Sequence, residues 1–318
     1  MGEMRKRGSV VFGYNRMHMK KRVIALVALL FVSTVALPSA NAQTTHAQTG
    51  VVESITMSPS SSKYKIDAGK TINDQLTVVN DGGSAYDFLV YARPYSIVGN
   101  DYTNPNFTAT PTNADVYGWV EFPQTKYHLA AGASTTVPYS IHVPVGAAPG
   151  GHYGVIFAET QPVLGATTGN SVIRKKRVGS IIYATVNGTY RTGGQVTGSE
   201  IPFWQVQPPL HSTVSAHNSG NTDFTDTVRL TVRDVLGNVK YGMTKDYQIL
   251  PDTSRTMVLD WKESSWFGLY KVETQQEFLG KTVKNEGYVL MMPRFIPIAL
   301  LVVIVIGGVY AWIRRRKS

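Results

Sequence analysis

The chain carries a run of 19 residues without a single charge, from Phe295 to Ile313, followed at once by the four cations Arg314 to Lys317. A helix of this length spans about 28 Å, close to the hydrocarbon thickness of a bilayer. Because lipid offers the backbone no hydrogen-bond partners, an isolated segment crosses it only as a helix. The run predicts a single transmembrane helix, with residues 294–318 forming the anchor and a short cytoplasmic tail.

Proteins that a sortase attaches to the cell wall end in a similar hydrophobic and basic tail. Such tails carry an LPxTG-type motif just upstream, and the stretch from Asn285 to Arg294 contains none. A lipid anchor is therefore the preferred interpretation.

The formal net charge of +10 lies at the two ends of the chain. Seven cations and one acid precede Val23 and four cations follow Ile313, so the residues between them carry 20 basic and 20 acidic side chains. Basic ends flanking apolar runs direct membrane topology. A neutral middle gives no electrostatic reason to expect nucleic acid as a partner.

Residues 1–42 have the pattern of a secretory signal peptide. A basic start is followed by an apolar run from Val23 to Leu37, and Ala40 and Ala42 form a small-x-small cleavage pattern that predicts a mature start at Gln43. The chain has no cysteine, which excludes a disulfide scaffold for this exported protein.

The segment after Val51 consists of short alternating runs separated by turn residues. Val137, Tyr139 and Ile141 alternate with polar residues, and so do Val228, Leu230 and Val232. A period of two with one polar face is typical of antiparallel strands that cover a core. Hairpin turns are expected at Gly99-Asn100, Gly237-Asn238 and Gly280-Lys281. An all-β, immunoglobulin-like β-sandwich architecture follows.

An internal repeat predicts two tandem sandwiches. Asn80-Asp-Gly82 and Gly150-Gly-His-Tyr153 recur in the same order as Asn218-Ser-Gly220 and Phe267-Gly-Leu-Tyr270. The first copy is longer through an insertion around Val98 to Trp119. We place domain one at residues 43–192 and domain two at 193–293, with Ile181–Val186 ending domain one and a linker at Arg191–Gly194.

These markers resemble those of a known family. Residues 52–190 resemble the first domain of bacterial WxL-interacting surface proteins through Asn80-x-Gly82, Ala131-Gly132-x-Ser134, Val143-Pro144, Gly150-Gly151-x-Tyr153 and Arg177-Val-Gly-Ser-Ile-Ile. Residues 195–292 resemble the Ig-like domain that follows it there, through Asn218-Ser-Gly220-Asn221, Leu250-Pro251 and Gly268-x-Tyr270. The resemblance implies a signal peptide, two Ig-like domains and a C-terminal membrane helix, with peptidoglycan binding by the first domain and host-protein binding by the second.

Two groups of residues in domain one are candidate ligand contacts. The cations Arg174, Lys175, Lys176 and Arg177 form a charge cluster that suits an anionic wall polymer or lipid headgroups, or else a solvated loop before a strand. The aromatic residues Tyr102, Phe107 and Tyr117 of the insertion suit contact with carbohydrate or protein, or else cap the end of the sandwich. Trp119 begins an alternating run and is expected in the core.

Three aromatic residues of domain two, Trp261, Trp266 and Phe267, flank the turn into its last hairpin. They suit a surface that faces the membrane or a partner. One buried Trp per sandwich is equally ordinary, so both interpretations stay open.

Nothing in the sequence favours catalysis. Histidines lack close metal-ligand spacing, thiols are absent, and neither a GxSxG elbow nor a phosphate-binding glycine loop occurs. We expect no enzyme, cofactor or metal. The expected function is that of a membrane-anchored bacterial cell-surface protein, single-pass with its ectodomain outside, that binds a cell-wall polymer or another surface protein. The alternatives are an envelope assembly chaperone whose exposed strand edge completes a client, and an anchor subunit of an envelope complex.

Overall fold

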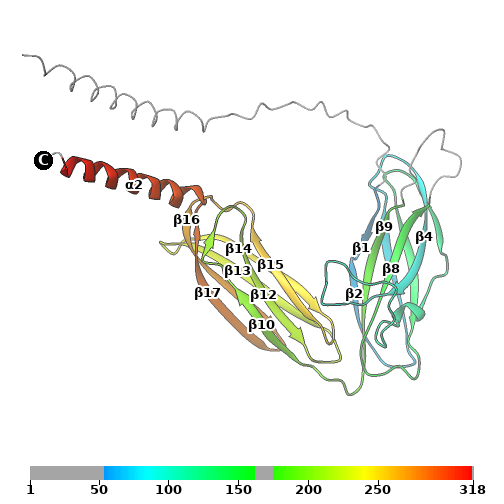
Figure 1. Ribbon diagram of the computed structural model, residues 1–318. Helices are drawn as coiled ribbons and strands as arrows, with labels where there is room; N and C mark the ends of the chain where they lie inside the picture. Colours follow the sequence, from blue (N-terminus) through cyan, green and yellow to red (C-terminus); the bar gives the residue numbers. More distant parts are fainter. Residues whose placement is uncertain (1–53, 162–174, 317–318) are drawn as a thin grey trace, which may run out of the picture. The chain divides into compact units, whose positions relative to one another are not determined.

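The computed structural model describes residues 54–161 and 175–316 (Figure 1). The expected signal peptide, the start of the mature chain and Arg174 lie outside the described residues. The described part consists of two Ig-like β-sandwiches followed by one long apolar helix, as the alternating runs and the repeat predict.

Domain one is a sandwich of two sheets, with strand orders β1-β3-β7-β5 and β2-β9-β8-β4-β6. Its strands are β1 (Thr56–Ser58), β2 (Ser61–Ile66), β3 (Thr71–Val79), β4 (Tyr86–Pro94), β5 (Val120–Glu121), β6 (Lys126–Leu129), β7 (Ser134–His142), β8 (Gly150–Gln161) and β9 (Arg177–Val186). Alternation decides which side chains enter the core: Val137, Tyr139 and Ile141 of β7 are buried, as expected.

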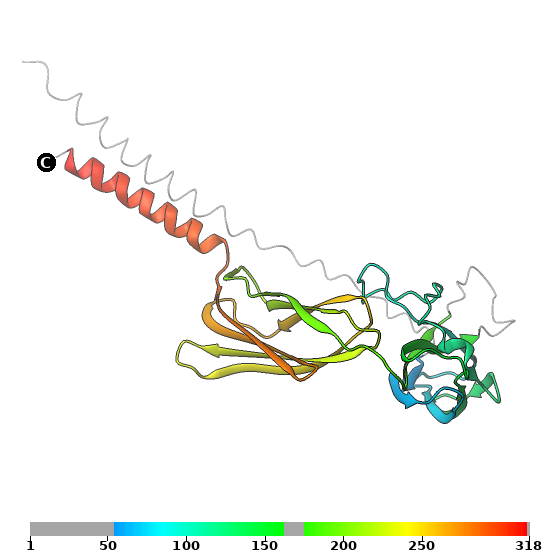
Figure 2. The ribbon, with the colours of Figure 1, turned by 90° about the horizontal axis from the view of Figure 1, so that it is seen from below.

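Strand β8 departs from alternation because both of its faces are covered. Its residues from Gly150 to Ala158 are all buried. One face packs into the sandwich core. The other packs beneath the insertion after β4, where Tyr153, Phe157 and Tyr183 of β8 and β9 form a cluster with Tyr102 and Phe107. The insertion therefore runs outside the two sheets (Figure 2). Its aromatic side chains add a further layer to domain one.

The expected hairpin turn at Gly99-Asn100 does not join two paired strands. Both residues have φ of 63°, and they lie inside the insertion between the isolated bridge partners Ser96 and Asn106. Positive φ explains why a Gly-Asn pair occurs here. The turns at Gly237-Asn238 and Gly280-Lys281 do connect antiparallel neighbours, as predicted.

Domain two has a three-stranded sheet, β10-β12-β15, and a five-stranded sheet, β11-β17-β16-β13-β14. Val228, Leu230 and Val232 point into its core with no exposed surface. The strands are β10 (Gly194–Glu200), β11 (Trp204–Gln205), β12 (Leu210–Asn218), β13 (Phe224–Asp234), β14 (Val239–Ile249), β15 (Ser254–Trp261), β16 (Gly268–Phe278) and β17 (Lys281–Met291).

The Asn-x-Gly marker of the repeat corresponds to the same arrangement in both domains, a buried Asn side chain that hydrogen-bonds backbone groups. Asn80 is fully buried, and its side chain donates to the carbonyls of Ser84, Leu129 and Ala130 while accepting from the N–H of Gly82. Asn218 is also fully buried and bonds the carbonyls of Thr222 and Ile249 and the N–H of Gly220. Each Asn closes a corner whose backbone groups would otherwise lack partners.

Three residues separate the helix α2 (Phe295–Arg315) from the end of β17. None of its 21 residues is buried. Among the described residues it is the one helix long and apolar enough to cross a membrane, with a mean hydropathy of 2.5. Apolar surface of this extent is stable against lipid and not against water, which makes α2 a candidate membrane anchor.

Candidate ligand-binding site

A groove in domain one, with a volume of about 870 Å³, brings together residues from a sheet and from the insertion. Arg177 is the first residue of β9, and Arg93 lies near the end of β4. Phe107 and Tyr117 come from the insertion that covers these strands. Three of the residues predicted from sequence, Phe107, Tyr117 and Arg177, therefore line one groove. We call it the Arg93–Arg177 groove.

The two guanidinium groups of the groove are held by aromatic rings. The Arg177 guanidinium lies 4.3 Å from the centre of the Phe157 ring and 5.7 Å from that of Phe107, and Arg93 lies 5.4 Å from that of Tyr91. Such stacking orients an Arg. Arg177 also hydrogen-bonds the Tyr91 hydroxyl, and its charge acts on Glu159. Neither Arg forms an ion pair with a residue of the described ranges. Two oriented guanidinium groups that form no salt bridge suit an anionic ligand.

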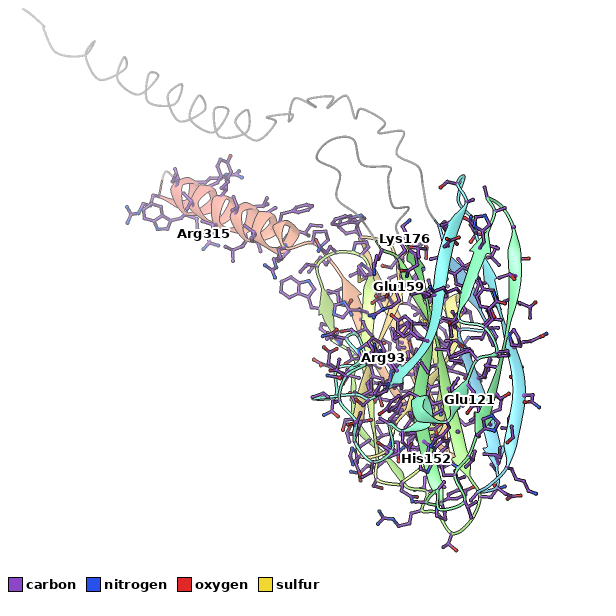
Figure 3. The ribbon with its side chains drawn as sticks, turned by 90° about the vertical axis from the view of Figure 1, so that its right-hand side faces the viewer. Arg93, Glu121, His152, Glu159, Lys176 and Arg315 are labelled. Carbon is purple, nitrogen blue, oxygen red and sulfur yellow. The ribbon has the colours of Figure 1, made fainter. Side chains whose placement is uncertain are left out.

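The other cations of the predicted cluster have different roles. Lys175 forms an ion pair of 3.3 Å with Glu159, which also accepts a hydrogen bond of 2.7 Å from Tyr91. The Tyr91 hydroxyl and Lys175 hold the pKa of Glu159 below its usual value. Lys176 pairs through its backbone with Thr160. In Figure 3, Lys176, Glu159 and Arg93 follow one another along domain one.

The aromatic residues of the insertion lie in different environments. Tyr117 is 39% exposed and remains available at the groove. Phe107 is half-buried against Phe157, at 5.0 Å between ring centres. Trp119 is buried in the core, as expected. Tyr102 faces domain two, where its hydroxyl accepts a hydrogen bond from the Leu250 N–H at 2.8 Å.

Sequence reasoning missed Arg93. The residue reaches the groove because β4 and β9 both pair with β8, so Arg93 opposes Val155 and Arg177 opposes Glu159. That pairing joins segments more than 80 residues apart in the chain. A local signal was present, since Arg93 is the one cation in a mostly apolar strand, but it does not identify a partner.

A seam of hydrogen bonds joins the two sandwiches. Lys63 donates to Thr225 at 2.8 Å and to Gln248 at 2.6 Å. Tyr153 donates to the Asp223 carboxylate at 2.9 Å and accepts from the Asp223 N–H at 2.9 Å. Burial at this seam raises the pKa of Asp223, although Tyr153 and the nearby Lys63 act in the opposite direction. The carboxyl is therefore more easily neutralised than an exposed one.

Tyr102 strengthens the seam from the insertion. Besides its bond to Leu250, its hydroxyl lies 2.5 Å from the Thr253 hydroxyl, and the Arg255 guanidinium lies 4.3 Å from its ring centre. Asn100 accepts a further bond from the Ser254 N–H at 2.7 Å. Asn100 and Tyr102, at the start of the insertion, therefore serve as structural connectors between the two sandwiches.

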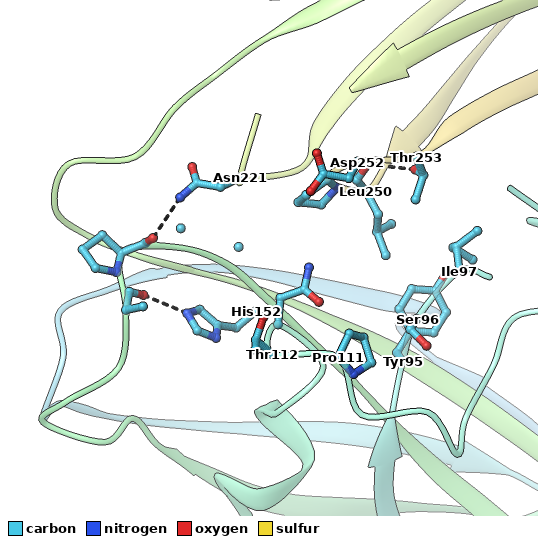
Figure 4. Close-up of a pocket in the computed structure, with 16 residues that line it drawn as sticks. Tyr95, Ser96, Ile97, Pro111, Thr112, His152, Asn221, Leu250, Asp252 and Thr253 are labelled. Carbon is cyan, nitrogen blue, oxygen red and sulfur yellow. Dashed lines mark hydrogen bonds between the residues drawn. The ribbon is translucent and has the colours of Figure 1, made fainter. Parts of the chain in front are cut away.

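A second cavity, of about 450 Å³, lies at the seam (Figure 4). His152 is its one imidazole, and both ring nitrogens face acceptors: Asp115 at 2.8 Å and the Ala148 carbonyl at 2.8 Å. The protonated form of the ring donates to both acceptors, so this environment favours it. Burial lowers the pKa of His152, but Asp115 and Ala148 outweigh it and the pKa is raised. A His with both ring nitrogens engaged in this way serves a structural role.

Metal binding has no support in the part of the chain that the structure describes, because no group of three or more His, Asp or Glu side chains is placed to hold an ion there.

No family model matches the sequence, and no curated protein matches it. Solved structures give similarities of low identity. The class 5 fimbriae chaperone CfaA is 15% identical, with 74% of this chain and 99% of that chain covered and a TM-score of 0.37. The chaperone DraB of E. coli is 13% identical, with 74% and 96% covered and a TM-score of 0.38. The CupB2 chaperone of Pseudomonas aeruginosa is 10% identical, with 74% and 100% covered and a TM-score of 0.36. At these values the similarity carries no argument about function.

Proposed function

We propose that the chain is a membrane-anchored surface protein whose domain one binds an anionic cell-wall polymer in the Arg93–Arg177 groove. The observation that carries the proposal is the pair of ring-stacked guanidinium groups that form no ion pair among the described residues. The helix α2 supplies the anchor, with its basic end in the cytoplasm. The resemblance to the first domain of WxL-interacting proteins supports the same class of ligand.

The remaining groove residues suit a polymer that carries sugars. Tyr117 offers an exposed ring, and Asn104 and Asn106 supply amide groups at the rim. Asp101 also lines the groove, but its carboxylate is engaged by the Thr103 side chain and N–H and by the Asn104 N–H, which hold its pKa below the usual value. The groove thus combines two cations, an aromatic face and amides.

The test measures sedimentation of the purified full-length chain, in detergent, with membrane-free cell walls. The variant Arg93→Ala/Arg177→Ala removes both guanidinium groups, and Lys65→Ala/Lys70→Ala removes two exposed cations of domain one outside the groove. We expect the first variant to bind several-fold more weakly than wild type, and the second to bind as wild type does. Salt should weaken wild-type binding more than that of the arginine variant, because exposed charges are screened over about 10 Å at 0.1 M salt.

Two results would count against this proposal. Equal binding by wild type and the arginine variant would exclude the groove as the site. Absence of sedimentation by every variant, with all of them folded, would exclude the polymer and direct the search to a protein partner.

A second candidate function rests on the edge of β9. Strand β2 pairs with β9 only from Ile181 to Val186, so within the described ranges no strand is paired with Arg177–Ser180 on that edge, although β1 lies nearby. A client strand added there would give the chaperone-like function. Copurified proteins that protect the amides of Arg177–Ser180 from hydrogen exchange, and that are unfolded once released, would support it. Folded partners or polysaccharide would not.

A further inference from the structure

One end of domain two is tied closely to the membrane helix. Strand β17 ends at Met291 and α2 begins at Phe295, so three residues separate them. Three residues span at most about 10 Å even when fully extended. If α2 crosses the bilayer, as the proposed function requires, this end of the sandwich lies within reach of the lipid headgroups.

Strand register places three other segments at the same end. In β11, Trp204 pairs with Leu290 of β17. The turn before β16 also lies here, since Gly268 pairs with Met291. The β13–β14 turn joins them, because Asp234 at the end of β13 pairs with Tyr270.

These segments expose large apolar side chains, which we call the basal patch. Leu236 is 84% exposed and Trp266 is 53% exposed, and the full set is Phe203, Trp204, Val235, Leu236, Trp266 and Phe267. The sequence left two interpretations open for Trp261, Trp266 and Phe267: contact with a membrane or partner, or burial. In the structure Trp266 and Phe267 are exposed, whereas Trp261 stacks on Tyr241 and packs against the core of domain two. The residues of the patch come from three segments that are far apart in the sequence, and strand pairing brings these segments to the same end of domain two. Such a gathering marks a surface that is covered in use.

The junction is held by hydrogen bonds that limit its freedom. Trp204 donates its indole N–H to the Met292 carbonyl at 2.8 Å, and the Met292 N–H donates to Gln205 at 2.9 Å. Pro293 is buried. Arg294, the last residue before α2, is exposed and forms no ion pair with any described residue. The segment that enters the membrane is therefore part of domain two and not a free linker.

We propose that the basal patch rests in the headgroup region of the same bilayer that α2 spans. Tryptophan and phenylalanine favour this region because their rings are apolar and large, and Trp adds a polar N–H. The unpaired Arg294 lies at the level of lipid phosphates, where a guanidinium binds well. The patch adds a second membrane contact to the helix, and this inference depends on the proposed anchor.

The absence of cysteine allows a direct test with single labels on the full-length chain in liposomes. Leu236→Cys reports on the patch. Val145→Cys is the matched control, because Val145 lies in a turn of domain one and is 87% exposed. Ile306→Cys in α2 reports on the anchor. Each variant carries an environment-sensitive fluorophore, and quenchers attached to lipid headgroups or acyl chains are added. We expect the label at 236 to be quenched several-fold more strongly than the label at 145, with headgroup quenchers the most effective.

The outcomes separate the patch from the anchor. If the label at 306 is quenched and the label at 236 behaves like that at 145, the anchor stands and the inference is wrong. If the label at 306 is not quenched either, the anchor itself is wrong. A label at 236 that is shielded from water but not quenched by any lipid would show that a protein covers the patch, which also overturns the inference.

Discussion

Two asparagines perform the same task at equivalent corners of the two domains. Asn80 and Asn218 are fully buried, and each bonds backbone groups from separate turns. An amide carries both donors and an acceptor, which is why a residue of this type serves carbonyls and an N–H at once. The corner therefore depends on one side chain in each sandwich.

Replacing Asn218 by Ala should destabilise domain two. The carbonyls of Thr222 and Ile249 and the N–H of Gly220 would lose their partner, and an unsatisfied buried group costs about 1–3 kcal/mol. Chemical denaturation measures the change in the free energy of unfolding. Asn104→Ala, at an exposed position, is the control and should stay within about 0.5 kcal/mol. Equal stability of the two variants would mean that the corner does not depend on the amide.

Residue types that act locally could be recognised in the sequence, and those that act across the fold could not. The Asn-x-Gly markers were recognised because the Asn bonds a Gly two residues away. Tyr102 and Tyr117 look alike in the sequence, yet one is held by Leu250 of the other sandwich and one faces the groove. Only the long-range pairing distinguishes them.

At the scale of elements, the insertion after β4 explains both the groove and the seam. It covers the outer face of β8 and β9, and its first part bonds to domain two. The sandwich class followed from alternating strands and the repeat, because both are local patterns. The Arg93–Arg177 groove did not, because β4 and β9 meet only through β8.

The seam should weaken as pH rises. The pKa of Asp223 is raised in the folded state, so its neutral form contributes fully below the ordinary carboxyl value and this contribution is lost as pH rises through the folded pKa. Asp223→Asn keeps an acceptor for Tyr153 and cannot ionise. Its stability relative to wild type should therefore increase from about pH 4 upward. Thermal unfolding of both proteins at several pH values measures this difference.

A constant difference between Asp223→Asn and wild type across the pH series would contradict the raised pKa. Asp260→Asn is a suitable control, because Asp260 lies on β15, outside the seam. Its difference from wild type should not rise with pH in this way.

At the scale of the whole molecule, we expect attachment to the membrane to depend on α2. Deletion of Phe295–Ser318 should move the protein from the membrane fraction to the soluble fraction, because no other described helix is long and apolar enough to span. Exposed turns alone bind a bilayer weakly and reversibly, so the basal patch should not retain the protein after a high-salt wash. Deletion of Arg316–Ser318 alone, which spares the helix, is the control and should leave the protein in membranes. If the protein that lacks Phe295–Ser318 stayed in the membrane fraction, a further membrane anchor would have to exist.

The chain enters domain two at one end of the sandwich and leaves it at the other. Gly194, where the first strand begins, pairs with Asn218, whereas Met291, where the last strand ends, pairs with Gly268. If domain one binds the wall and α2 spans the bilayer, as proposed, a pull between the two runs along the strands. Under such tension β17 must slide past β16, and the bonds of eleven paired positions are strained together instead of opening one by one. This strand arrangement should make domain two resist stretching along its strands.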